Sequence, residues 1–232
     1  MARFEVHEVE GVHYVDLVLN NETVRAEAGS LSYLEGNISV HSKLIPSIPG
    51  AIKSVLSMQA VYRPTYTGTG VVTLLSSLGG FHIMDLDEES WILERGTYWA
   101  SEGSVDVSFH RVDLWTAFRA REPIIYLQTK VEGSGKVAVR TRGPIQEMTL
   151  AEGQKVAVDG KSVIGWSSDV RFRIRRATDN FFGKFTSGQG RLRVFFGPGR
   201  VLLNPAPHWR YRRFAESEDD RPFIPWQESC PS

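Results

Sequence analysis

The chain has 232 residues, of which 41% are hydrophobic and 23% charged, and its 27 basic side chains balance its 27 acidic ones. This composition is typical of a globular protein, and the length allows one large β domain or two small ones. Cys230 is the only cysteine. An intramolecular disulfide is therefore excluded, and a cysteine-based metal site is not expected.

The N-terminus lacks the apolar run of a secretory signal, and the chain has no stretch of 18 apolar residues that could span a membrane. We therefore expect a cytoplasmic protein with no transmembrane segment.

Alternating apolar residues predict strands along most of the chain, because one face of a half-buried strand recurs every second residue. Turn signals recur about every ten residues, which is typical of all-β domains. Two segments instead have helical spacing, at 50–58 and 113–120. The sequence thus predicts an all-β fold, with one or two short helices in the links. The predicted strand segments are 4–19, 22–41, 69–84, 89–110, 123–128, 136–142, 154–176, 191–196 and 200–203.

Three segments share one pattern: 22–40, 89–110 and 154–176. Each has an alternating apolar pair, then an acidic residue followed closely by glycine, then a second alternating run about ten residues later. The pattern predicts about three pseudo-repeats of a hairpin unit. We expect a β domain over 1–205 and an extended or partly disordered acidic tail over 206–232.

Glycines and apolar residues at hairpin spacing carry a family resemblance over roughly residues 12–205, including Gly143 with Gly153 and Gly197 with Gly199. The chain resembles the TRAP-like family of uncharacterised proteins related to altered inheritance of mitochondria protein 24, a mitochondrial biogenesis family. The resemblance implies a β-sandwich or double-stranded β-helix, often assembled as a homotrimer, with no catalytic motif. The N-terminus does not have the pattern of a mitochondrial presequence, so we do not expect an organelle role.

Catalytic patterns are weak. The chain has no GxSxG motif, and the carboxylates at 85–89 are explained by loop solvation. His82 and His110 lie on segments that could meet in a sheet and bind a metal, as in cupin-like enzymes, although solvent-facing histidines are the simpler interpretation. We predict no cofactor, no metal and no enzymatic activity, with a cupin-like metal enzyme as the weaker alternative.

Charge is unevenly distributed along the chain. Residues 1–170 hold 15 basic and 21 acidic side chains, residues 171–213 hold 11 and 1, and residues 214–232 hold 1 and 5. In the basic segment, arginines at every second position should share one face of a strand. The candidate anion-binding face comprises Arg171, Arg173, Arg175, Arg191, Arg193 and Arg210.

Three interpretations of this face remain open. The arginines could match acidic groups of the same chain or of another subunit, bind nucleic acid or a phosphorylated ligand, or contact an anionic membrane. The leading hypothesis is a non-enzymatic interaction or scaffold protein that acts as a homo-oligomer. The alternative is a nucleic-acid or anionic-ligand binder that uses the arginine-rich 171–213 face.

Overall fold

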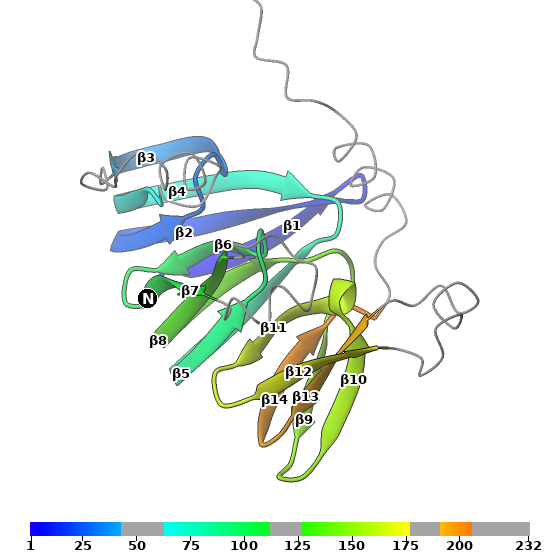
Figure 1. Ribbon diagram of the computed structural model, residues 1–232. Coiled ribbons are helices and arrows are strands. Elements are labelled where there is room, and N and C mark those ends of the chain that lie inside the picture. Colours follow the sequence, from blue (N-terminus) through cyan, green and yellow to red (C-terminus); the bar gives the residue numbers. More distant parts are fainter. Residues whose placement is uncertain (43–62, 112–126, 177–190, 206–232) are drawn as a thin grey trace, which may run out of the picture.

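The computed structural model describes residues 1–42, 63–111, 127–176 and 191–205, and these are mostly β-strand (Figure 1). This confirms the predicted all-β class. The helices predicted at 50–58 and 113–120 and the tail predicted at 206–232 lie outside the described residues. In chain order the described elements are β1 (Arg3–Val9), β2 (Val12–Ala26), β3 (Leu31–His41), β4 (Thr65–Ser77), β5 (Phe81–Leu93), β6 (Tyr98–Glu102), β7 (Asp106–Arg111), β8 (Leu127–Arg140), β9 (Gln146–Leu150), β10 (Lys155–Asp159), the 3₁₀ turn η1 (Gly160–Ser162), β11 (Val163–Ser167), β12 (Arg171–Arg176), β13 (Arg191–Phe196) and β14 (Gly199–Leu203).

The described strands form two sheets. The large sheet is antiparallel and has the order β3-β4-β2-β6-β8-β5-β11-β14-β9, with β1 paired to β2 and β7 paired to β8. The small sheet has the order β10-β13-β12. In Figure 1 the small sheet lies beside β9, β14 and β11, at one end of the large sheet. The double-stranded β-helix that the resemblance implies stays a prediction.

The β5–β8 pair is strongly curved. Gln128 and Arg140 lie near opposite ends of β8, yet both bond to one short turn: the Gln128 side chain donates to Glu94 at 3.0 Å and the Arg140 amide to the Thr97 carbonyl at 2.6 Å. A straight strand would separate these two residues by about 40 Å. Gly135 sits in the bend opposite a register shift in β5, where a Cβ would lie 2.7 Å from the Ser104 hydroxyl.

The buried hydrophobic residues form three clusters. The first packs β2 against β4 and β6, and the second lies within the curved β5–β8 pair. The third joins the two sheets: Trp166 of the large sheet packs against Phe172 and Phe195 of the small one, with ring centroids 5.2 and 5.5 Å away. These aromatic contacts attach the small sheet by its inner face and leave its outer face for other roles.

Two turns in the predicted repeat units have the same structure, at residues 27–30 and 94–97. In each, the glutamate carbonyl accepts bonds from the amide (3.2 Å) and hydroxyl (2.7 Å) of the Ser or Thr three residues later. Gly29 and Gly96 both have positive φ, 76° and 72°. The third unit differs, because Asp159 caps η1 by accepting from the Lys161 amide at 2.9 Å. A three-unit repeat therefore stays a prediction.

A buried ion pair also connects the sheets. Glu94, directly after β5, pairs with Arg193 of β13, and the two side chains are only 8% and 7% exposed. Gln128 donates to the same Glu94 oxygen, and the Arg193 guanidinium carbon lies 5.6 Å from the Phe172 ring centroid. Removing one partner would take a buried counter-ion from the other charge, which is far costlier than losing an exposed pair.

We predict that Arg193→Met destabilises the protein by about 3–5 kcal/mol, because it removes a buried counter-ion of the Glu94 carboxylate. Arg200→Met is the matched control, because Arg200 pairs with Glu89 at the surface, where both side chains are about one-third exposed; it should cost about 1 kcal/mol or less. Chemical denaturation measures both. Equal losses for the two variants would show that the buried pair has no special role.

Candidate functional site

The exposed face of β12 carries three arginines. Arg171, Arg173 and Arg175 are exposed, whereas Phe172 and Ile174 between them are half-buried and turned toward the core. Successive side chains of a strand point to opposite faces, so these arginines form one row with about 6.7 Å between neighbours. The structure thus brings together three of the six residues predicted for this face.

Arg193 is separated from that row, which corrects its predicted membership of one exposed arginine face. In the β12–β13 register Arg193 lies opposite Ile174, so it belongs to the inward-facing row and forms the buried pair with Glu94. Arg191 begins β13 opposite Arg176, and its side chain lies outside the description. Arg210 lies outside the described residues.

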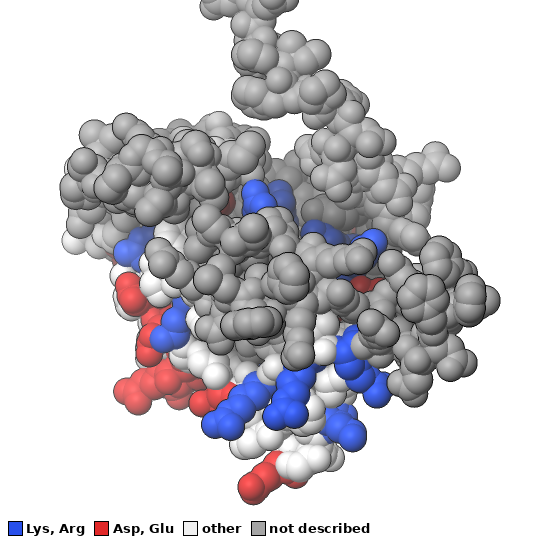
Figure 2. Space-filling model, viewed as in Figure 1, with Lys and Arg blue, Asp and Glu red and all other residues white. Residues whose placement is uncertain are grey.

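The arginine row has no acidic partner within the described part of the chain. Other arginines there do: Arg63 lies 3.4 Å from Glu27, and Arg200 lies 3.1 Å from Glu147. Among the described residues, no ion pair reaches Arg171, Arg173 or Arg175. Three like charges in one row repel one another, so binding an anion there would relieve the repulsion. Figure 2 shows basic side chains gathered at the lower right, where Figure 1 places the small sheet.

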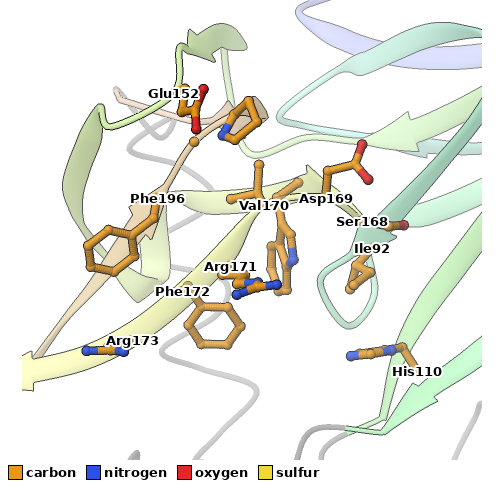
Figure 3. Close-up of a pocket in the computed structure, with 13 residues that line it drawn as sticks. Ile92, His110, Glu152, Ser168, Asp169, Val170, Arg171, Phe172, Arg173 and Phe196 are labelled. Atoms are coloured by element: carbon orange, nitrogen blue, oxygen red, sulfur yellow. The ribbon is translucent and has the colours of Figure 1, made fainter.

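A groove of about 920 Å³ lies beside this row (Figure 3). Phe172, Trp166 and Ile92 provide apolar lining, and Arg171 and Arg173 lie on β12. His110 of β7 approaches from the opposite side in Figure 3. The groove also contains carboxylates, since its remaining lining residues are Glu152, Ser168, Asp169, Val170, Phe196, Gly197 and Pro198.

One edge of β12 borders no other described strand. β12 pairs with β13 along one side and ends the small sheet on the other. Such an edge presents backbone N–H and C=O groups that another extended chain can bind. The combination of a strand edge, an arginine row and an apolar groove was not predicted from the sequence, because strand order and grooves depend on contacts between distant segments.

The two histidines considered for metal binding do not come together. His82 lines a pocket with His13 and Thr141, whereas His110 lines the groove beside β12, and the two pockets have no residue in common. Burial lowers the pKa of His82, against an opposing effect of Glu147. Among the described residues, no group of three or more His, Cys, Asp or Glu side chains could hold a metal ion.

Part of the carboxylate cluster at 85–89 has structural contacts. Asp85 pairs with Lys136 at 2.8 Å, and Glu89 accepts from the Trp91 indole at 3.0 Å and also pairs with Arg200. Burial opposes ionisation of Glu89, but the hydrogen bonds from Trp91 and Arg200 outweigh it and lower the pKa of this carboxyl. An ionised, paired carboxylate suits a structural role better than proton transfer at neutral pH.

A solved structure has a similar fold. A crystal structure of protein SPYM3_0169 from Streptococcus pyogenes, a structural genomics target, has a TM-score of 0.69 and 20% sequence identity, and the match covers 94% of this chain and 99% of that one. At this identity the likeness concerns the fold alone. No curated protein matches the chain significantly. Within the described residues, no helix is long and apolar enough to cross a membrane.

The sequence profile described as "Mitochondrial biogenesis AIM24" matches residues 4–206, which confirms the resemblance found in the sequence. The chain therefore belongs to the AIM24 mitochondrial biogenesis family.

Proposed function

We propose that this chain is a non-enzymatic interaction module that binds an extended acidic peptide along β12. The observation that supports the proposal is the exposed row Arg171, Arg173 and Arg175, which has no ion-pair partner among the described residues and lies on an edge strand. Guanidinium groups stay protonated near neutral pH and present only donors, so they suit anion binding rather than proton transfer.

A peptide fits this surface because an edge strand can add one more strand. Backbone hydrogen bonds supply affinity in this mode, and alternate side chains of the ligand supply specificity. A ligand strand repeats its side chains with the same spacing of about 6.7 Å as β12. Acidic residues at every second position would therefore stand opposite the three arginines, and opposite-charge pairs across strands are favourable.

Nucleic acid fits less well. A single strand would need aromatic faces on which its bases could stack. Phe172 instead packs edge-on against Trp166, and its ring centroid lies 5.6 Å from that of Phe195. Its ring is therefore part of the core. Glu152 and Asp169 also line the groove and would repel a continuous chain of phosphates. A peptide in which acidic and neutral side chains alternate carries fewer negative charges past these carboxylates than a chain with a phosphate at every unit.

We predict that replacing Arg171, Arg173 and Arg175 together by serine weakens binding of a labelled peptide with alternating glutamates about tenfold, since three cross-strand charge pairs are lost. Fluorescence anisotropy at two salt concentrations measures the affinity, and the salt dependence should become shallower.

The matched control replaces Arg3, Arg95 and Lys136 by serine, which removes the same charge from the large sheet and one of its turns, away from this row. It should change the affinity less than twofold. Equal effects of the two triple variants would contradict a site on β12. Tighter, salt-sensitive binding of a mixed single-stranded oligonucleotide through the same arginines would favour nucleic acid instead.

A second candidate function is self-association through β3, in accord with the homo-oligomer expected from the sequence. β3 ends the large sheet, and Tyr33, Leu34 and Val40 on it are 54%, 36% and 47% exposed. Long apolar edge strands are pairing sites, and natural proteins usually cover or charge them. A closed homotrimer, which the resemblance implies, is one assembly that would cover this edge, and a cytoplasmic location stays a prediction.

We predict that Leu34→Lys combined with Val40→Lys reduces the sedimentation coefficient from that of an oligomer to that of a monomer at micromolar concentration, because two charges on β3 oppose strand pairing. Val6→Lys with Val9→Lys is the control, since both valines are exposed on β1. A wild-type protein that already sediments as a monomer would exclude this assembly.

A further inference from the structure

The C-terminal part of the sequence contains an acidic pattern with the same period as the arginine row. Residues 214–220 are Phe-Ala-Glu-Ser-Glu-Asp-Asp. In an extended strand, Glu216, Glu218 and Asp220 would share one face, because side chains alternate. Arg171, Arg173 and Arg175 show the same i, i+2, i+4 spacing on β12.

We propose that the segment 216–220 of the same molecule occupies the open edge of β12 as an added strand, with its three alternate carboxylates opposite the three arginines. The inference rests on the proposed function in taking β12 as a peptide-binding edge, and it names the peptide. An external acidic ligand would then compete with this segment for β12, so the segment would lower the apparent affinity of β12 for that ligand.

The charge pattern supports this pairing more strongly than net charge would. Three arginines and three carboxylates with equal spacing can form three ion pairs whether the added strand runs parallel or antiparallel to β12. The central pair, Arg173 with Glu218, is the same in both orientations. A shift by one residue would turn the carboxylates to the other face of the added strand. A shift by two residues would keep the face but pair only two of the three arginines, so the register that pairs all three is favoured.

The chain is long enough to make this contact. The last described residue is Pro205, shortly after β14, and Glu216 lies eleven positions further along the chain. An extended segment of that length reaches about 36 Å. β12 has six residues and is about 20 Å long. Because β13 and β14 are joined by the short turn at Gly197–Pro198, β14 and the small sheet are close neighbours.

Other acidic groups are less suited to this edge. The run at 85–89 lies within β5, where Asp85 is paired with Lys136 and Glu89 with Arg200. Reaching β12 of the same molecule would require β5 to leave the large sheet. The segment 216–220 lies beyond the last described strand, so it can bind β12 without breaking any described strand pairing.

Hydrogen exchange on the full-length protein tests the inference. Amides of residues 171–176 that do not bond to β13 should be protected at low salt in the wild type. The variant Glu216→Gln, Glu218→Gln, Asp220→Asn should exchange at these amides at least tenfold faster. These positions lie outside the described strands, and circular dichroism checks that the fold is kept.

Two further variants test the register and the pairing. Exchanging the residues at 217 and 218 (Ser217→Glu with Glu218→Ser) keeps composition and charge but moves the central carboxylate off the face, and it should also lose protection. Arg173→Glu and Glu218→Arg should each lose protection, and the combined variant should regain it.

Equal exchange rates at 171–176 in the wild type and the neutralised tail variant would overturn the inference. Loss of protection on dilution would also overturn it, because the contact would then form between molecules.

The experiments distinguish failure of this inference from failure of the proposed function. If the neutralised variant binds the glutamate peptide through Arg171, Arg173 and Arg175 without any change in exchange, β12 is a binding edge but the tail is not its occupant. If the arginine variants bind the peptide normally, the proposed function itself fails.

Discussion

The ion pair between Glu94 and Arg193 is the contact on which the position of the candidate site depends. β13 is the central strand of the small sheet, so an inward Arg193 sets which face of its neighbours points inward as well. Because β12 is paired in register with β13, Ile174 lies opposite Arg193 and the arginines on either side of it turn outward. Apolar packing of Phe172 and Phe195 on Trp166 holds the two sheets together. The ion pair favours one alignment of the sheets, because separating a buried charge from its partner costs several kcal/mol, about 3–5.

A second glutamate–arginine pair follows the same design. Glu27 begins the turn that matches the one at Glu94, and Arg63 lies 3.4 Å from its carboxylate. The Arg63 guanidinium also lies between two rings, 4.9 Å from the Tyr98 centroid and 4.8 Å from that of Phe109. Burial raises the pKa of Glu27 although Arg63 opposes the rise. In both places, the carboxylate of a turn glutamate meets an arginine from a distant segment, so long-range contacts hold these tight turns in place.

Partners, rather than residue type, separate the structural arginines from the candidate binding arginines. Arg63, Arg193 and Arg200 each have a carboxylate partner and lie over an aromatic ring. Arg171 and Arg175, in the exposed row of β12, have neither kind of contact among the described residues, and Arg173 has only a distant ring contact, 5.9 Å from Phe196. Membership of the AIM24 family supplies no ligand for this row. The geometry of an edge strand beside a groove is therefore the basis for proposing peptide binding.

Local alternation in the sequence was sufficient to predict most of the strands and the outward row at 171, 173 and 175, because the direction of a side chain along a strand depends only on its position in that strand. It missed β9 at residues 146–150 and did not predict that β8 runs unbroken from Leu127 to Arg140. It could not place Arg193 relative to that row. Its face depends on the register between β12 and β13, which lie in segments separated along the chain, and on the partner that Glu94 provides from the other sheet. The separation of His82 from His110 and the curvature of β5 and β8 likewise required the tertiary structure. Long-range pairing is set by packing and by the matching of buried charges, and neither is contained in the period of a single strand.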